Sequence, residues 1–219
     1  MTTLASDRVS AVLDKLYVDE KVKDEPAIAA IIADGRPLQE FTHKELNDLF
    51  ADSYLPVQRE VGDLLYMLAR TKQATRIVEF GTSFAISTIF LASAVRDNGG
   101  GEVITTELMS TKARVAQENL TEAGLDDLVQ IREGDALKTL SDVNGPIDLV
   151  LLDAWKDLNL PVLRLLEPVL APGAIVIADD THVGQDVHAP YLSHVRGAGY
   201  LSVDLPFGDG LEISMRVAD

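Results

Sequence analysis

From Thr75 onward, the sequence alternates between short apolar runs and segments with helical spacing. The runs that predict strands are RIVEF, EVITTE, LVQIRE, IDLVLLD and GAIVIAD, and a helical pattern follows each of them. Strands that alternate with helices indicate βαβ units and a parallel sheet with helices on both faces. The final stretch, YLSVDLPFGDGLEISMRV, instead predicts strand, turn and strand, with the turn at Gly208–Gly210. We therefore expect an α/β fold with a doubly wound, seven-stranded sheet whose last strand is antiparallel.

The first 73 residues carry no strand pattern and are typical of helices. Ser6 is a candidate cap for a first helix that ends near Tyr17, and Pro26 suits the first turn of a second helix. Thr42 and Glu45 have the spacing of a capping box at the start of a third helix. LPVQREVGDLLYMLARTK follows as a longer amphipathic helix. We expect a single domain over residues 1–219, in which residues 1–73 form a helical cover or lid and residues 74–219 form the ligand-binding core.

The composition narrows the possible partners. The formal net charge of the 219 residues is -16 and there is no basic cluster, which argues against nucleic acid as a partner. The chain has no cysteine, which excludes disulfides, thiolate metal sites and a cysteine nucleophile. No apolar run reaches membrane-spanning length, and the first residues lack the pattern of a signal peptide. We expect a cytoplasmic protein with neither nucleic acid nor a membrane as a partner.

Acidic residues stand where the predicted strands end. They are Glu79, Glu107, Asp135, Asp153 and the pair Asp179–Asp180. In a doubly wound sheet, ligands bind at the carboxyl ends of the strands, so these acids are candidates for a binding site. An Asp that follows a strand often caps the next helix, but this explains only some of these positions.

The turn after the first strand, VEFGTSFAIST, differs from a dinucleotide-binding turn. It has one glycine, Gly81, where the dinucleotide pattern has three. Glu79 stands just before this turn, and a carboxylate there repels a diphosphate but suits a ligand with an amino group and a sulfonium. Glu107 closes the second strand, where an acid can accept hydrogen bonds from both ribose hydroxyls.

Over Leu55–Val217, the sequence resembles the class I S-adenosylmethionine-dependent O-methyltransferases, specifically their cation-dependent catechol O-methyltransferase-like branch. The segments that carry the resemblance are VEFGTSFAIST, TTEL, EGDA, LLDAWKDLNLP, VIADD and GDGLEIS. The most specific is DAWKD followed by ADD, which resembles the metal-and-lysine centre of animal catechol O-methyltransferase in order and spacing. The resemblance implies a Rossmann-like fold, S-adenosylmethionine as the methyl donor and S-adenosylhomocysteine as the product.

The resemblance also implies roles for individual residues. The implied cofactor contacts are Glu79 and Gly81 at the methionine end, Ser87 near the methionine carboxylate, Glu107 at the ribose, Asp135 and Ala136 beside the adenine, Asp153 and Trp155 next to the cofactor, and Val57 and Gly62 in a short segment before the first strand. The implied metal ligands are Asp153, Asp179 and Asp180, for Mg²⁺ with Mn²⁺ or Ca²⁺ as alternatives. Lys156 is the implied catalytic base.

Physical chemistry gives these residues a purpose. A phenol has a pKa near 10, by analogy with tyrosine, and is mostly neutral at pH 7. A divalent cation lowers that pKa, and oxygen ligands from three Asp side chains suit magnesium. Without a cation, three carboxylates in one crevice would repel one another. A lysine at the start of a helix opposes the helix dipole, so Lys156 has some other reason for its position. We expect methyl transfer to a hydroxyl of a small aromatic vicinal diol.

The sequence departs from the family pattern at three places. Asp180 stands where the family usually has Asn, Ala85 where a second glycine is common, and Ala154 where His or another polar residue is usual. His188 and His194 are six residues apart, which does not place both rings on one helix face, so we interpret them as packing or surface residues. His182 is interpreted as a loop residue.

Three questions stay open at the level of sequence. The acceptor could be a different small molecule, and two other classes of protein are possible: a nicotinamide-dependent oxidoreductase and a non-catalytic S-adenosylmethionine-binding protein. The missing glycines count against the first class, and Lys156 with three acids counts against the second. The resemblance also implies a possible homodimer.

Overall fold

A seven-stranded sheet forms the centre of the molecule, in the order β3-β2-β1-β4-β5-β7-β6. The computed structural model describes residues 2–37 and 40–217. The strands are β1 (Arg76–Phe80), β2 (Glu102–Glu107), β3 (Val129–Glu133), β4 (Ile147–Leu152), β5 (Leu170–Asp179), β6 (Tyr200–Leu205) and β7 (Leu211–Arg216). The first five strands are parallel, and β7 is antiparallel to both β5 and β6. The predicted doubly wound, Rossmann-like sheet with an antiparallel last strand is confirmed.

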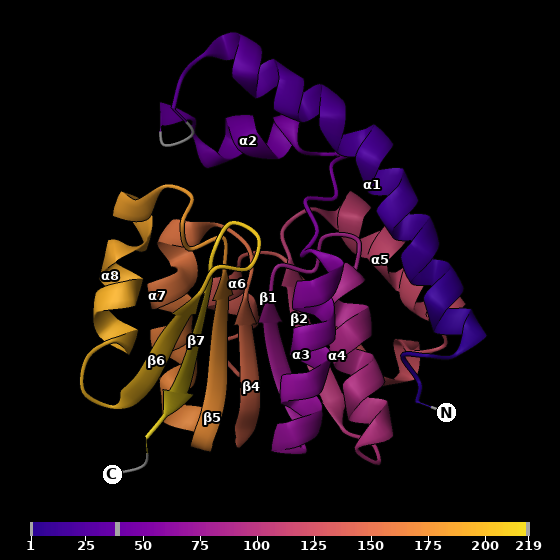
Figure 1. The fold of residues 1–219 in the computed structure, drawn as a ribbon, viewed down its shortest axis with the longest axis vertical. Helices are drawn as coiled ribbons and strands as arrows, with labels where there is room; N and C mark the ends of the chain where they lie inside the picture. Colours follow the sequence, from indigo (N-terminus) through magenta and orange to yellow (C-terminus); the bar gives the residue numbers. More distant parts are fainter. Residues whose placement is uncertain (1, 38–39, 218–219) are drawn as a thin grey trace.

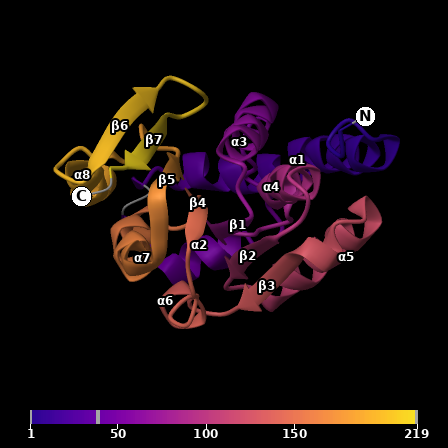
Figure 2. The same cartoon turned by 90° about the horizontal axis from the view of Figure 1, so that it is seen from below.

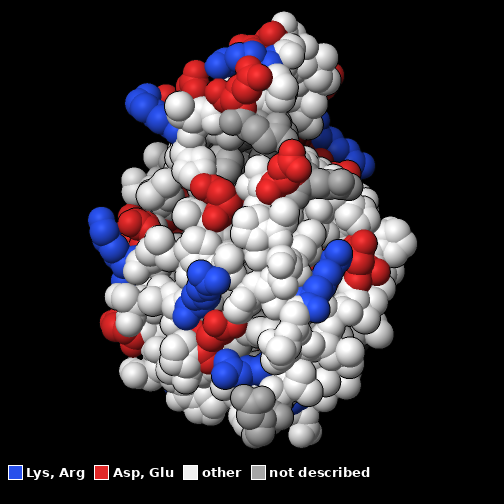
Figure 3. All heavy atoms as spheres, turned by 90° about the vertical axis from the view of Figure 1, so that its left-hand side faces the viewer, with Lys and Arg blue, Asp and Glu red and all other residues white. Residues whose placement is uncertain are grey.

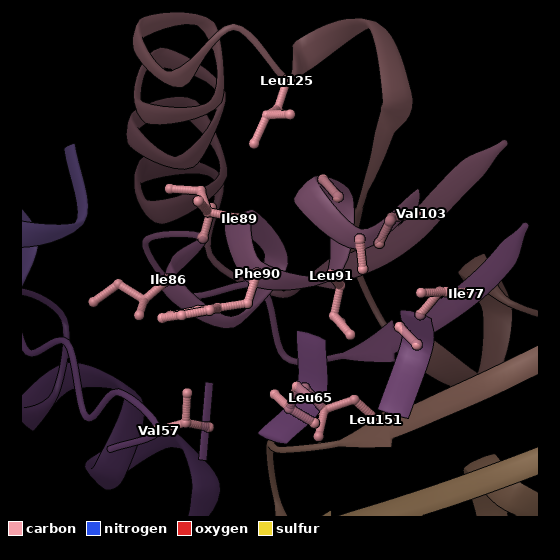
Figure 4. Packing of buried hydrophobic residues seen from close by; sticks show 14 of the residues in the cluster. Val57, Leu65, Ile77, Ile86, Ile89, Phe90, Leu91, Val103, Leu125 and Leu151 are labelled. Atoms are coloured by element: carbon pink, nitrogen blue, oxygen red, sulfur yellow. The ribbon is translucent and has the colours of Figure 1, made fainter. Parts of the chain in front are cut away.

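Helices cover both faces of this sheet (Figures 1 and 2). They are α1 (Asp7–Asp34), α2 (His43–Leu49), α3 (Arg59–Lys72), α4 (Ile86–Asp97), α5 (Ser110–Ala123), α6 (Ala136–Thr139), α7 (Asn159–Leu166) and α8 (Gln185–Val195), with the short 3-10 turns η2 (Asp126–Leu128), η3 (Lys156–Leu158) and η4 (Glu167–Val169). One hydrophobic cluster joins the sheet to α1, α3, α4 and α5, and a second joins it to α6, α7 and α8. Figure 4 shows part of the first cluster, to which Leu65, Ile77, Phe90 and Leu151 belong. This packing fixes which strand ends lie side by side.

The N-terminal region differs from expectation in one respect. The two predicted helices around Tyr17 and Pro26 are a single helix of 28 residues, with Pro26 inside it. The residues that join the two predicted helices contain neither Gly nor Pro, so nothing stops the first helix before Pro26. The missing N–H of Pro26 removes one helical hydrogen bond, and the helix nevertheless continues to Asp34.

The predicted caps explain where the N-terminal helices begin. The Ser6 side chain accepts a hydrogen bond from the backbone of Val9. Thr42 and Glu45 form the expected capping box at the start of α2. Asp24, buried within α1, accepts hydrogen bonds from the backbone N–H groups of Tyr54 and Leu55, at 2.5 and 2.8 Å. These contacts tie α1 to the segment that leads into α3.

Helix α2 lies above the carboxyl ends of the parallel strands (Figure 1). Together with the end of α1 it forms an upper lobe, on which charged side chains gather in Figure 3 and which a narrowing sets off from the body. The ion pairs Arg36–Glu45 and Lys44–Asp48 belong to this lobe. In the part of the chain that the structure describes, no helix is long and apolar enough to cross a membrane.

Candidate active site

The three acids that end β4 and β5 lie together. Asp153 directly follows β4, Asp179 is the last residue of β5, and Asp180 follows it. Each offers a carboxylate oxygen, and these oxygens lie within 4.8 Å of one another. Asp180 has a φ of 58°, a left-handed conformation that Asp and Asn tolerate better than most residues. Because β4 and β5 are parallel neighbours, the topology itself brings the three side chains to one point.

Lys156 lies against this acidic triplet. Its Nζ is 3.0 Å from Oδ2 of Asp180 and 3.5 Å from Oδ1 of Asp153. The lysine begins η3, the turn after Asp153. Burial lowers the pKa of Lys156, but the carboxylates of Asp153, Asp180 and Asp179 outweigh burial and raise it overall. In the absence of another cation, Lys156 is held in its charged form.

The triplet has the electrostatics of a cation site. Burial raises the pKa of Asp153 well above its ordinary value, opposed by Lys156 and reinforced by the other two acids. Burial and the neighbouring Asp180 raise the pKa of Asp179 to about 6. When all three carboxylates are ionised, they and the one ammonium leave two negative charges, which a divalent cation would balance. The residues therefore fit a hard cation such as Mg²⁺, which prefers oxygen ligands.

Glu79 lies at the same edge of the sheet but in a different environment. Its side chain is fully buried on β1 and accepts hydrogen bonds from the hydroxyls of Ser87, Thr88 and Thr105, at 2.6, 2.5 and 2.6 Å. Burial raises the pKa of Glu79, and the three hydroxyls act in the opposite direction. The carboxylate is thus held at the start of α4, behind the glycine turn.

The glycine turn passes close to the next strand. Gly81 has a φ of 112°, and a Cβ atom at this position would lie 2.3 Å from the carbonyl oxygen of Asp153. Only glycine satisfies both conditions. Ala85, which stands where a second glycine is common, has a φ of 70° and is fully buried. The turn therefore keeps a left-handed backbone at Ala85 at a cost of roughly 1–2 kcal/mol.

A small hollow opens beside this turn. It is lined by Tyr54, Leu55, Pro56, Val57, Gly81, Thr82, Ser83, Phe84, Ile86, Ser87 and Asp153. Four of the predicted cofactor residues, Val57, Gly81, Ser87 and Asp153, are thus brought together at one place. The hollow lies between the segment before α3 and the start of α4, so both the N-terminal region and the core contribute to it.

The other predicted cofactor residues lie outside the lining of this hollow. Glu107 ends β2, and its two carboxylate oxygens accept hydrogen bonds from the backbone N–H groups of Ser83 and Met109, at 2.8 and 2.9 Å. Each oxygen has a second lone pair available to a ligand. Asp135 caps α6 by accepting from the N–H of Leu137, and Ala136 is buried. Gly62 packs against Phe90 on α4, where a Cβ would lie 2.4 Å from the ring.

Comparison with known proteins shows the family to which this chain belongs. Residues 78–181 match the family described as a methyltransferase domain. The catechol O-methyltransferase of Mycobacterium tuberculosis is 33% identical over 182 residues, which are 83% of this chain and 74% of that protein. The chain is a member of the catechol O-methyltransferase-like family. It is therefore an S-adenosylmethionine-dependent O-methyltransferase, and its substrate is a small-molecule acceptor.

Solved structures agree with this assignment to the catechol O-methyltransferase-like family. Cofactor-bound Rv0187 from MTB is 27% identical, with a TM-score of 0.70 over 94% of this chain and 97% of that one. The O-methyltransferase TomG from Streptomyces achromogenes, solved in complex with SAM, is 27% identical with a TM-score of 0.67, over 78% of this chain and 86% of that one. These relatives set aside the nicotinamide-dependent alternative.

Two residues near the hollow and the acidic triplet were missed by the sequence analysis. Lys112 on α5 is buried, and its Nζ donates to the carbonyl of Ser53 at 2.8 Å and lies 5.2 Å from the centre of the Phe84 ring. His43, at the start of α2, stacks on Trp155. Neither has a local sequence signal, because each contact joins segments that are far apart in the chain.

The other histidines have distinct positions. His188 is fully buried, which fits the interpretation as a packing residue. Burial and the nearby Lys156 lower its pKa, which favours the neutral ring. His194 binds Glu167, with 2.6 Å between Nε2 and Oε1. His182 is an exposed loop residue, as expected, and its Nε2 lies 2.9 Å from Asp204 of β6. The pair links the loop after Asp180 to the edge of the sheet.

Proposed function

We propose that this methyltransferase depends on a divalent cation, Mg²⁺ in the first place, and methylates a hydroxyl of a small aromatic vicinal diol. The observation that carries the proposal is the acidic triplet with Lys156 against it. Three carboxylates with oxygens within 4.8 Å of one another repel unless a cation joins them. A vicinal diol offers two adjacent oxygens to such a cation, which a single hydroxyl does not.

The proposed cofactor site lies beside the triplet. Val57, Gly81 and Ser87 of the hollow contact the methionine part of S-adenosylmethionine, with Glu79 behind them, and Glu107 accepts hydrogen bonds from the ribose hydroxyls. Asp135 and Ala136 lie at the adenine, and Trp155 lies between cofactor and acceptor. Asp153 belongs to both sites, because it lines the hollow and is one of the triplet. This shared residue supports a short path between the methyl donor and the acceptor oxygen.

Each residue of the acceptor site has a proposed task. Asp153, Asp179 and Asp180 would hold the cation, which when bound lowers the pKa of the acceptor hydroxyls and fixes their direction. Lys156 Nζ accepts the proton of the attacked hydroxyl. Burial favours its neutral amine and the carboxylates favour its ammonium form, so neutralising the carboxylates prepares it as a base. As the new O–C bond forms, the S–C bond of the sulfonium breaks and its electron pair stays on sulfur, which gives S-adenosylhomocysteine.

A methyl-transfer assay tests this function directly. Catechol, phenol and a non-aromatic vicinal diol are each incubated with S-adenosylmethionine, in excess EDTA and after addition of magnesium. We expect catechol to be methylated only when magnesium is present. Phenol should show no comparable turnover. Full activity in EDTA, after the metal content has been checked, would rule out the metal role. Equal turnover of phenol would rule out the diol.

We further propose that the N-terminal region, residues 1–73, serves as a cover of the same domain and also as the contact of a homodimer. Val18, Val22, Ile28 and Ile32 are 63, 70, 45 and 74% exposed, on the face of α1 that turns away from the core. In an antiparallel pair of helices centred on Glu25, Val18 faces a second copy of Ile32 and Val22 a second copy of Ile28. Such a stripe is self-complementary, as a two-fold axis requires.

Charged residues also lie along this stripe. The pairing brings Glu25 opposite Glu25 of the second copy and Lys21 opposite Ala29, so each Lys21 lies one helical turn from the two glutamates and offsets their repulsion. Sedimentation of the wild type and of Val22→Glu tests the pairing. We expect a dimer that becomes a monomer in the variant, with Asp14→Asn as a control that stays dimeric. A monomeric wild type at micromolar concentration would contradict it.

A further inference from the structure

His43 joins the N-terminal cover to the acceptor side of the site. Its ring stacks on that of Trp155, with 5.1 Å between the ring centres and 13° between the planes. Its Nε2 lies 3.1 Å from Oδ1 of Asp157. Trp155 and Asp157 flank Lys156, so one residue of α2 holds the segment on both sides of the proposed base.

The contact is well defined because the start of α2 is fixed. Thr42 and Glu45 cap this end of the helix reciprocally, and His43 is its first residue. Among the described residues, the His43–Asp157 pair is the one side-chain hydrogen bond that links α2 to residues 74–217. The other polar contacts of α2 stay within its lobe, as in Lys44–Asp48 and Arg36–Glu45. The attachment of the cover at this point therefore depends on His43.

We propose that His43 is a positioning residue for the acceptor: by stacking on Trp155 and binding Asp157, it sets the wall of the acceptor entrance. The inference rests on the proposed function, because Trp155 and Lys156 border the acceptor only if the triplet binds it. A ring held in place by a second ring offers the acceptor a fixed flat surface, and aromatic contacts of this kind are directional. Without His43, the Trp155 ring loses the stacking contact that holds it in place.

The same geometry predicts which substrate is affected. The hollow proposed for the cofactor is lined by the segment Tyr54–Val57 and the glycine turn, and neither His43 nor Trp155 belongs to it. Lys156 Nζ is held by Asp180 and Asp153, not by His43. Loss of His43 should therefore act on the binding of the acceptor, while cofactor binding and the chemical step change little.

The two contacts of His43 can be separated by substitution. His43→Ala removes both, and His43→Phe keeps a ring for the stack while it loses the partner of Asp157. Asp157→Asn keeps a polar side chain but removes its charge. Lys44→Ala is the matched control, because Lys44 is the next residue of α2, is 84% exposed and pairs only within the helix, with Asp48.

The fluorescence of Trp155 gives a direct readout, since the chain has one tryptophan. Acrylamide quenching of the whole protein then reports on this ring alone. We expect stronger quenching and a shifted emission in His43→Ala, recovery in His43→Phe, and no change in Lys44→Ala. Unchanged quenching in His43→Ala would overturn the stacking role whether or not catechol is an acceptor.

Steady-state kinetics with catechol and magnesium give the second readout. We expect KM for catechol to rise about three- to tenfold in His43→Ala, the range of one aromatic contact, with kcat and KM for S-adenosylmethionine near the wild-type values. His43→Phe should restore most of the loss. If both KM values rise together with a lower Tm, His43 only supports the fold and the proposal is wrong. If wild-type enzyme does not turn over catechol, the proposed acceptor fails, and the quenching result still decides the placement of His43.

Discussion

Glu79 and the acidic triplet occupy the same edge of the sheet, but the protein neutralises their charges in different ways. Glu79 is fully buried, and three hydroxyl groups donate hydrogen bonds to it. Asp153, Asp179 and Asp180 share one crevice, and in the described part of the chain Lys156 is the one side chain that pairs with them. The first charge is satisfied by the protein itself, whereas the second set retains an excess of negative charge.

The difference indicates what each group is for. A buried carboxylate with its hydrogen bonds complete is a permanent part of the structure. Carboxylates that repel one another destabilise the folded protein unless a cation binds between them. Such an arrangement is therefore typical of a ligand-binding site. The two groups lie on neighbouring strands, β1 and β4 with β5 beyond it, and the comparison can be tested by removing members of each.

Removal of one triplet acid should have the largest effect. We expect Asp179→Asn to lower kcat/KM for catechol by about 10³-fold or more, because cation chemistry supplies several kcal/mol to such a step. Calorimetry with magnesium should show the loss of binding, with the affinity for S-adenosylhomocysteine unchanged. Asp186→Asn, at an exposed acid on α8, is the control. Wild-type magnesium affinity in Asp179→Asn would show that the triplet has another role.

Substitution of Lys156 should come next. We expect Lys156→Ala to lower kcat by about 10²–10⁴-fold, the usual contribution of a general base, with nearly intact cofactor and metal affinity. Lys156→Arg should not restore the rate, because a guanidinium does not release its proton near neutral pH. Part of the lost rate should return at high pH, where hydroxide takes the proton. Wild-type kcat in Lys156→Ala, under conditions where chemistry limits turnover, would remove Lys156 from the mechanism.

Glu107 tests the cofactor side of the comparison. We expect Glu107→Ala to weaken S-adenosylhomocysteine by about 1–3 kcal/mol, the cost of lost hydrogen bonds to a charged acceptor. Calorimetry measures this loss, and magnesium affinity should not change. Glu102→Ala is the control, since Glu102 begins the same strand and pairs with Arg76 at the far end. An unchanged affinity in Glu107→Ala would mean that its two backbone hydrogen bonds are its whole role.

Asp180→Asn sharpens the comparison inside the triplet. The change restores the residue that is usual in the family, and Asn tolerates the left-handed backbone at this position. We expect magnesium to bind roughly tenfold more weakly, because the number of charged ligands sets affinity in such sites. The cation-free protein should become more stable near neutral pH, because Asp180 is one of the causes that raise the pKa of Asp179. Tighter magnesium binding in the variant would contradict the assignment of Asp180 as a ligand.

The fold could be predicted from the sequence because strands and helices alternate with clear boundaries. The same topology placed Asp153, Asp179 and Asp180 at one edge, so their proximity followed once the strands were assigned. The break that was predicted between the first two helices was wrong, since α1 runs without interruption from Asp7 to Asp34 with Pro26 inside it. Nothing in the sequence indicated that His43 would meet Trp155, because that contact depends on how α2 docks onto the sheet.

Glu79 itself provides the smallest test, through the dependence of stability on pH. Burial raises its pKa above the ordinary value of 4.5. Between the two values, the folded protein binds more protons than the unfolded chain, so the free energy of unfolding falls as the pH rises through this interval. Glu79→Gln keeps the shape of the side chain and does not titrate. We therefore expect the free energy of unfolding of the variant to fall less steeply than that of the wild type.

Urea denaturation from pH 4.5 to pH 8, without divalent cations, measures the difference between the two curves. The triplet acids titrate in both proteins, and Glu79→Gln also removes a charge that raises the pKa of Asp153, so the difference reports on Glu79 together with this coupling. Thr88→Val is the matched variant: it removes one of the three hydroxyl donors, which favours the protonated form of Glu79 and should steepen the fall. Parallel curves for wild type and Glu79→Gln would mean that the hydroxyls offset burial completely. Glu79 would then titrate in the folded protein as it does in the unfolded chain, and Glu79 and the triplet would differ only in what neutralises them.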